Sequence, residues 1–176
     1  MRHLKLNHHD EILDLSAGTG ILAEEIALRF GPLKRLVLND PSKQMLEEAK
    51  YRMRYAKNVG FTSYFAEELA FDDNTFSTVI CLNAFHYYTD QPAVLEQLLR
   101  ILKPGGTLYL LDWNRKGFFI FVNAIIKLWS KEHIHTRSFD ELKDLITEQG
   151  FILRKHKEWR FRWWNFCFLK CSKPKK

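Results

Sequence analysis

The sequence predicts an α/β fold in three layers, with a mostly parallel seven-stranded sheet between two layers of helices and an antiparallel strand pair at its C-terminal end. Short apolar runs alternate with helical patterns through most of the chain, which is the order that βαβ units produce. Two alternating segments then close the chain without a helix between them. At 176 residues, we expect residues 1–176 to form a single domain.

The seven strands are expected at 11–15, 35–39, 61–65, 76–85, 107–112, 151–159 and 161–171. Helices are expected at 21–30, 43–58, 91–104 and 138–150. Ser42 is a plausible N-cap for the second helix, and Ser138 with Glu141 forms a capping-box pattern at the start of the last one.

The stretch at about 114–137 is the one segment outside this alternation, and it looks inserted as a cap. Its apolar residues could cover a substrate pocket, pack as an ordinary helix on the sheet, or lie at a membrane interface. The sequence leaves these three alternatives open.

Composition limits the class of protein. A hydrophobic fraction of 46% and a charged fraction of 27% are typical of a globular protein, and we expect no stable membrane insertion because no apolar run approaches the length of a spanning helix. The three cysteines lack CxxC spacing, which argues against a disulfide framework or a zinc site and favours a reducing, cytoplasmic location. No histidine cluster has a matching ligand set, so we expect no metal.

Positive charge is concentrated near the end of the chain. Residues 151–176 contain nine Lys or Arg and one acid, Glu158. A basic, aromatic-rich tail can bind nucleic acid or an anionic membrane, but strands with charged residues toward solvent and aromatic residues toward the core have the same composition. We favour the second interpretation and expect no nucleic-acid partner.

The sharpest local motif is the turn Asp14-Leu15-Ser16-Ala17-Gly18-Thr19-Gly20, between the first strand and the first helix. Small residues there let the backbone approach a nucleotide-like ligand, and the helix N-terminus adds positive potential. Asp40 follows about 20 residues later, at the end of the second strand, where a carboxylate can bind both ribose hydroxyls. The alternative is that Asp40 only begins the turn before Pro41.

Four motifs in this order and spacing resemble the small-molecule branch of the class I S-adenosylmethionine-dependent methyltransferases, which includes the ubiquinone and menaquinone biosynthesis C-methyltransferases. They are ILDLSAGTG (12–20), LVLNDPSKQMLEEAK (36–50), AEELAFDDNTFSTVICLNAFHYY (66–88) and LLRILKPGGTLYLLDW (98–113). The resemblance implies a Rossmann-like fold, S-adenosylmethionine as cofactor, and methyl transfer to a carbon, oxygen or nitrogen atom of a small molecule.

The resemblance also implies the cofactor contacts, residue by residue. The methionine part would lie against the glycine turn, the ribose against Asp40, and the adenine between the segments that follow the second and third strands. The residues concerned are Asp14, Ser16, Ala17, Gly18, Gly20, Asp40, Pro41, Met45, Ala66, Glu67 and Asn83. For Met45, packing in the core is an equal alternative.

The chain departs from the family pattern at several places. Ser16 replaces a glycine, Phe65 replaces an acid that binds the adenine amino group, and Ser77 replaces an aspartate. Only about ten residues precede the first strand, so the usual N-terminal cover is shortened. Residues 114–137, a second copy in a homodimer, or the carrier of the substrate could close the site, or the chain could be a fragment or a weakly active relative.

Methyl transfer from a sulfonium needs alignment and exclusion of water more than a base. Four aromatic residues after the fourth and fifth strands are expected in the substrate pocket: His86, Tyr87, Tyr88 and Trp113. His86 is the one candidate catalytic residue, as a base, although a structural role is an equal alternative. Alternative functions are a non-catalytic S-adenosylmethionine-binding module and a nucleic-acid methyltransferase.

Overall fold

The computed structural model describes residues 4–117, 120–121 and 134–175, and the seven strands of this part form one sheet. The strands are β1 (Glu11–Leu15), β2 (Arg35–Asn39), β3 (Val59–Thr62), β4 (Phe76–Leu82), β5 (Leu102–Trp113), β6 (Ile152–Phe161) and β7 (Trp164–Ser172). Their spatial order is β3-β2-β1-β4-β5-β7-β6. The first five strands run parallel, and β7 is antiparallel to both β5 and β6.

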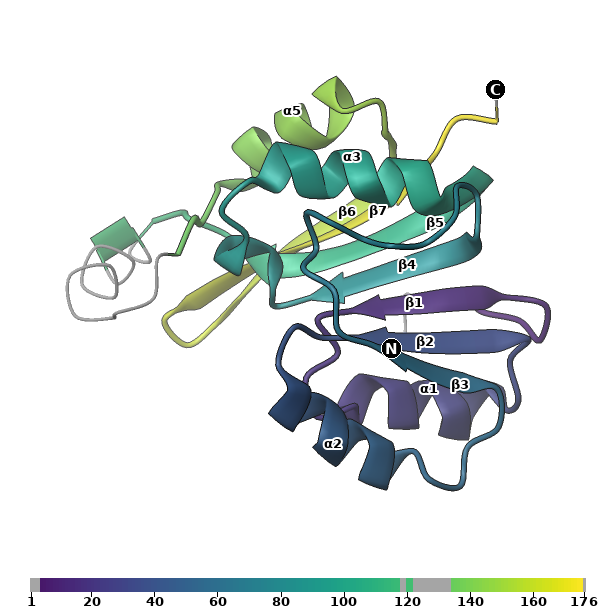
Figure 1. Ribbon diagram of the computed structural model, residues 1–176. Coiled ribbons are helices and arrows are strands. Elements are labelled where there is room, and N and C mark those ends of the chain that lie inside the picture. Colours follow the sequence, from purple (N-terminus) through teal and green to yellow (C-terminus); the bar gives the residue numbers. More distant parts are fainter. Residues whose placement is uncertain (1–3, 118–119, 122–133, 176) are drawn as a thin grey trace.

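Helices cover the two faces of the sheet in different places (Figure 1). The helices α1 (Ile21–Phe30) and α2 (Lys43–Arg52) lie on one face, beside β1, β2 and β3. The helices α3 (Gln91–Ile101) and α5 (Phe139–Glu148) lie on the opposite face, over the other half of the sheet. A single 3-10 turn, η1 (Phe85–Tyr87), follows β4. The α/β three-layer prediction with a mostly parallel sheet and an antiparallel end is therefore confirmed.

Each face has its own apolar core because residues alternate sides along a strand. Ile12, Leu38 and Ile80 point toward the core beside α1 and α2, where Ile26 is fully buried. Their neighbours on the same strands point to the other core, which α3 and α5 complete. The central strands are thus buried on both sides, as parallel sheets require.

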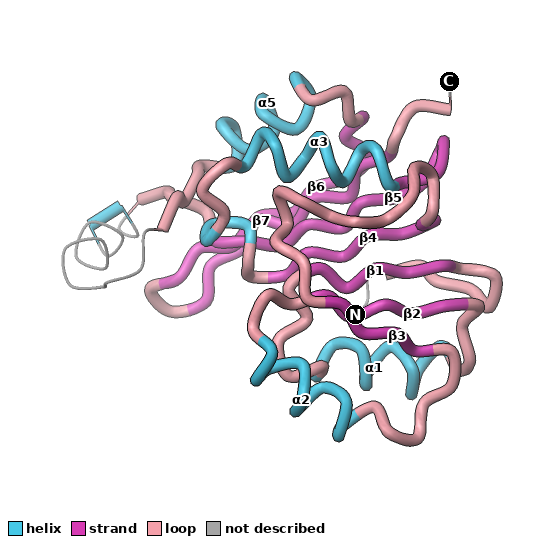
Figure 2. The backbone as a smooth tube through the Cα atoms, in the orientation of Figure 1, coloured by secondary structure: helices cyan, strands magenta, loops and turns pink. Residues whose placement is uncertain are grey.

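The order of the strands reverses between β1 and β4, since the chain proceeds outward from β1 to β2 and β3 and then returns to β4. In open α/β sheets, ligands bind outside the carboxyl ends of the strands at such a switch point. The segments that follow β1, β2 and β4 all leave the sheet at this edge, as the loops in Figure 2 show.

The third strand was predicted at 61–65, which is wrong by about two residues. It covers Val59–Thr62 and stops there because the side chain of Asn39 takes over the pairing. The Asn39 amide donates to the Tyr64 carbonyl at 3.0 Å, and its oxygen accepts from the Tyr64 N–H at 3.0 Å. The Asn39 side chain thus takes the place of the next pair of hydrogen bonds between β2 and β3, and the chain leaves the sheet there.

Other element boundaries also differ from the predictions. The second helix ends at Arg52 rather than at 58, because residues 53–58 turn toward β3 through Asn58, whose φ is 60°. The fourth strand ends at Leu82, where Asn83 with φ 54° leads into η1. The fifth strand starts five residues early, at Leu102, which pairs with Phe76.

The remaining helices and the hairpin lie close to their predicted places. The third helix covers Gln91–Ile101 and the last Phe139–Glu148, with the Ser138–Glu141 capping box formed as expected. The hairpin strands are offset from the predicted ranges by one to three residues, most at the start of β7, which is Trp164 rather than 161. Most of 114–137 lies outside the described residues, so its role as a cap stays a prediction.

All three cysteines are buried and free. No helix among the described residues is both long and apolar enough to cross a membrane. The part of the chain that the structure describes also contains no group of three His, Cys, Asp or Glu side chains that could hold a metal ion.

Candidate cofactor and active site

The glycine turn is a compact backbone loop that begins directly after β1. Ser16, Gly18 and Gly20 all have positive φ, at 58°, 54° and 78°. The Ala17 N–H donates to the Asn39 carbonyl at 2.9 Å, which ties the turn to the end of β2. The turn and the segment after β2 therefore form one unit at the edge of the sheet.

Gly18 and Gly20 of this turn have different surroundings. A Cβ atom at Gly20 would lie 3.1 Å from the Ala49 Cβ, so this position is glycine because α1 and α2 pack closely there. A Cβ at Gly18 would meet nothing within 4 Å. The space in front of Gly18 is open, as a backbone surface that receives a ligand requires.

Ser16 stands where the resembling family has glycine, and its side chain has a structural partner. Its hydroxyl lies 2.7 Å from the Tyr88 hydroxyl, which is also 3.7 Å from the Cys81 sulfur. Tyr88 is buried, and this burial, together with the nearby Cys81, raises the pKa of the phenol well above its usual value. Tyr88 thus supports the glycine turn from behind as a neutral hydrogen-bonding group.

Asp40 is buried at the end of β2, directly beside the glycine turn. One carboxylate oxygen accepts the Gly18 N–H at 2.8 Å, and the other accepts the Ser42 N–H at 2.9 Å. Asp40 therefore does begin the turn into α2, and it also fixes the glycine turn. Each carboxylate oxygen has a second lone pair, so both can still accept a hydroxyl hydrogen.

Asp14 is a second buried carboxylate at this edge, 2% exposed. Its Oδ2 has no hydrogen-bond partner among the described residues. Burial, with a smaller contribution from the charge of Asp40, raises the pKa of Asp14 to about 8. A buried, unpartnered carboxyl is costly unless a ligand satisfies it.

The adenine side of the predicted site is formed by the segments after β2 and β3. Pro41 and Met45 are exposed, so the alternative of core packing for Met45 does not hold. Ala66 is buried and Glu67 is partly buried. Phe65 projects into solvent with 67% exposure, which leaves an aromatic surface where the family has an acid.

Beside the ends of β4 and β5, where the substrate pocket was predicted, the structure brings His86 and Asp112 together. Asp112 accepts the backbone N–H of His86 at 2.7 Å and forms a short contact with the His86 Nδ1. Both side chains are buried, and the His86 Nε2 has no partner among the described residues. The His86 ring stacks on Trp113, with ring centroids 4.0 Å apart and an interplanar angle of 15°.

Of the other predicted pocket residues, Tyr87 lies beside this pair, whereas the hydroxyl of the buried Tyr88 contacts Ser16 behind the glycine turn. Tyr87 is 46% exposed and contacts the His86 ring at 4.2 Å between centroids. Asn83, which was predicted to contact the cofactor, is exposed at the end of β4, and its N–H donates to the Leu111 carbonyl at 2.7 Å. The segment that returns to the sheet also reaches this place, because the His135 N–H donates to the His86 carbonyl at 2.7 Å.

Sequence reasoning missed Asp112 and Asn39. Asp112 is an acid near the end of a buried strand, two residues before Asn114, and that placement was the available signal. Asn39 directly precedes Asp40, and nothing in the sequence indicates that it anchors the loop after β3.

Comparison with known proteins identifies the family to which this chain belongs. The sequence profile of the methyltransferase domain family matches residues 12–106, more than half of the chain and all of the glycine turn, Asp40 and β4. The chain belongs to the methyltransferase domain family. S-adenosylmethionine is accordingly its cofactor, as predicted.

The chain is similar to the ubiquinone/menaquinone biosynthesis C-methyltransferase of Idiomarina loihiensis, with 34% identity over 108 residues. That alignment covers 60% of this chain and 43% of the relative. The corresponding protein of Hydrogenovibrio crunogenus is 36% identical over 107 residues, which cover 59% of this chain and 42% of the relative. The match thus spans less than half the length of these curated relatives.

Among solved structures, an S-adenosylmethionine-dependent methyltransferase from Mesorhizobium loti has the same fold, with a TM-score of 0.81 at 14% sequence identity. The match covers 97% of this chain and 94% of that one. The predicted resemblance and the predicted fold are both confirmed by these comparisons.

Proposed function

We propose that this methyltransferase domain transfers the methyl group of S-adenosylmethionine to a small molecule that enters beside η1 and the end of β5. The unpartnered carboxyl of Asp14, at the open glycine turn, is the observation that carries the proposal. The methionine part of the cofactor has an ammonium group, which is the partner that a buried carboxyl lacks.

The residues present fit the cofactor. Gly18 leaves its backbone open, Asp40 keeps two acceptor sites for ribose hydroxyls, and Asp14 can accept from a cation. Met45 and Phe65 offer apolar surface to an adenine ring in place of the hydrogen bond that an acid at position 65 would make. When bound, the cofactor supplies a methyl group on a positively charged sulfur.

His86 is proposed as the group that accepts a proton from the acceptor. Asp112 holds Nδ1, which fixes the tautomer with its hydrogen on Nδ1 and leaves the lone pair on Nε2. Because Nε2 is buried and unpartnered, a nucleophilic hydroxyl or acidic carbon that reaches it would meet little competition from water. Stacking on Trp113 limits rotation of the ring.

The cofactor proposal is tested by calorimetry with S-adenosylmethionine and its demethylated product. Asp40→Ala should weaken both at least tenfold, because it removes both ribose acceptors and an anchor of the glycine turn. Asp72→Ala, which removes an exposed carboxylate from the loop before β4, is the matched control. Absence of binding to either compound at millimolar concentration would refute the proposal.

Methyl transfer is tested with radiolabelled cofactor against a panel of quinone, phenol and amine acceptors. With a competent acceptor, His86→Gln and Asp112→Asn should each reduce kcat about a hundredfold or more while the cofactor Kd stays within threefold. Cofactor binding without transfer to any acceptor would favour the non-catalytic binding module. Transfer to RNA or DNA alone would favour the nucleic-acid methyltransferase.

Three further expectations belong to the proposal. The buried free thiols suit a reducing, cytoplasmic compartment. Residues 114–137 are proposed to cover the acceptor, and residues 1–176 to act as a single domain. A homodimer is the alternative way of closing the site, and light scattering at micromolar concentration would detect it.

A further inference from the structure

A second concave site lies at the opposite edge of the sheet from the glycine turn. It is formed where β5 and β6 begin and β7 ends, with Thr107 paired to Ser172 at its base. The cavity has a volume of about 460 Å³. Since Thr107 and Trp113 are six positions apart on β5, the cavity is roughly 20 Å from the acceptor side at ~3.3 Å per residue.

The lining of this cavity is strongly basic. It contains six cationic side chains: Lys5, Arg154, Lys155, Lys170, Lys173 and Lys175. The described residues that line it include no Asp or Glu, and within residues 4–117, 120–121 and 134–175 none of the six cations forms an ion pair. Like charges this close together repel one another, and an anion bound between them would relieve that repulsion.

Neutral partners hold several of these cations in place. The Arg154 Nε donates to the Ser172 hydroxyl at 2.8 Å. The Lys170 ammonium lies 5.3 Å from the centre of the Tyr109 ring. The phenol of Tyr109 in turn accepts the backbone N–H of Lys5 at 3.2 Å. The Arg154 and Lys170 side chains are therefore positioned without loss of their charge, and Lys5 is held through its backbone.

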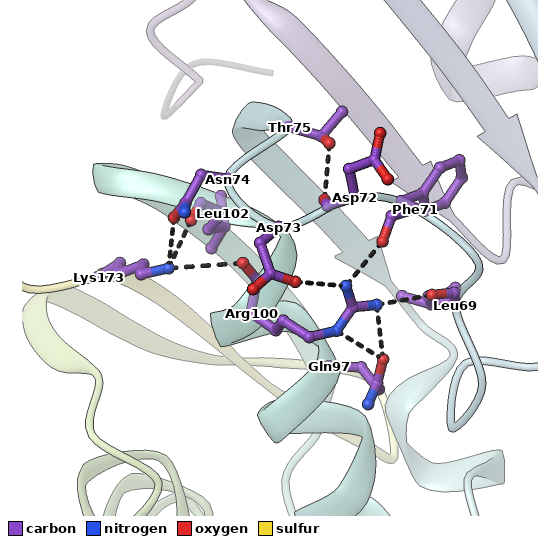
Figure 3. A network of polar contacts seen from close by, with 10 residues as sticks. All are labelled: Leu69, Phe71, Asp72, Asp73, Asn74, Thr75, Gln97, Arg100, Leu102 and Lys173. Carbon is purple, nitrogen blue, oxygen red and sulfur yellow. Dashed lines mark hydrogen bonds and ion pairs between the residues drawn. The ribbon is translucent and has the colours of Figure 1, made fainter.

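Lys173 is the most firmly held of the six (Figure 3). Its ammonium donates to the Asn74 side-chain oxygen and to the Leu102 carbonyl, each at 2.8 Å. It also reaches the carbonyl of Arg100 at 3.5 Å, and the Arg100 guanidinium fixes the loop before β4. A partly exposed network thus anchors the wall of the cavity to α3, and it occupies the Lys173 ammonium with three neutral acceptors.

We propose that this cavity binds a compact polyanion that carries two or more phosphate groups. Multiple Lys and Arg donors with hydroxyls of Ser172 and Thr107 suit phosphate oxygens, which accept several charge-assisted hydrogen bonds. A concave site of this size favours a compact ligand over a bilayer surface or a long nucleic-acid backbone. The site is independent of the cofactor crevice and does not depend on the proposed methyl transfer.

The test uses inorganic triphosphate as the probe and the full chain. Calorimetry at 50 mM NaCl should detect binding that weakens steeply at 200 mM NaCl, since screening reduces attraction between exposed charges. Lys155→Gln with Lys170→Gln should lower the affinity about tenfold or more. Lys57→Gln with Lys143→Gln removes the same charge from two exposed positions elsewhere and should change it less than twofold.

Cofactor binding should be the same in both double variants, which separates this proposal from the proposed function. No binding of triphosphate at millimolar concentration, or an equal loss in both variants, would overturn the proposal. Single-stranded RNA or anionic phospholipid vesicles that bind the wild-type chain more tightly than triphosphate, with the same dependence on Lys155 and Lys170, would also overturn it in favour of an extended partner.

Discussion

Asp14→Asn should stabilise the folded chain while it weakens cofactor binding. The folded protein holds the pKa of Asp14 at about 8, against an ordinary value of 3.8. Between these two pH values, the unfolded chain carries an ionised Asp14 and the folded chain a protonated one, so folding takes up a proton. The folded state therefore loses stability as pH rises from 3.8 to 8.

The size of this loss follows from the pKa difference. One pKa unit corresponds to 1.36 kcal/mol, so ionisation of Asp14 in the unfolded state costs the fold about 4 kcal/mol at pH 7. Asparagine has a similar shape and does not ionise. The variant should thus gain about 4 kcal/mol at pH 7 and about 1–2 kcal/mol at pH 5.

Urea denaturation at pH 5, 6, 7 and 8 measures the gain directly. The difference in unfolding free energy between Asp14→Asn and the wild type should grow with pH, and Asp72→Asn, at an exposed position, should show no such trend. A difference that is constant across this pH range would refute the reasoning. In an Asp40→Asn background the gain should be smaller, because the charge of Asp40 contributes to the raised pKa.

Three further predictions concern the glycine turn, its support by Tyr88, and the loop before β4. Gly20→Ala should lower the free energy of unfolding by about 2–4 kcal/mol in urea denaturation, since φ is 78° and the new Cβ would lie 3.1 Å from the Ala49 Cβ. Gly18→Ala should lower it by only about 1 kcal/mol, and should instead reduce cofactor affinity in calorimetry. Tyr88→Phe should cost about 1 kcal/mol by removing one hydrogen bond to the turn, and an unchanged melting temperature would contradict this. Arg100→Gln should cost about 2–3 kcal/mol, because its guanidinium holds two carbonyls of the loop before β4, and stability equal to the wild type would contradict this.

The sheet could be predicted from sequence because its signals are local. Apolar runs at 11–15 and 35–39 give strands at those positions, and the order of strands and helices gives the parallel topology. Strand ends were less predictable. The end of β3 depends on the side chain of Asn39, 25 residues from Tyr64, and no local pattern reports that contact.

The candidate site shows the same division. Their spacing in the sequence predicts that three of its residues lie close together, because Asp14 is near the end of β1, Gly18 is in the turn that follows it, and Asp40 directly follows the adjacent β2. His86 and Asp112 are 26 positions apart in the sequence. His86 follows the end of β4 and Asp112 lies near the end of β5, and the two meet only because of the register in which β4 pairs with β5. The sequence shows Ser16 only as a departure from the family's glycine, whereas in the structure its hydroxyl has a specific partner in Tyr88.

The placement of the two cores on opposite faces has a consequence for how the domain responds to its cofactor. The glycine turn and Asp40 border the core beside α1 and α2, whereas Tyr88 and the loop after β3 belong to the core beneath α3 and α5. A ligand that binds at the glycine turn and reaches the loop after β3 would therefore contact residues that border both cores. Its binding should slow amide hydrogen exchange in α2 and in α3 together, so that two half-domains that could open separately unfold as one cooperative unit.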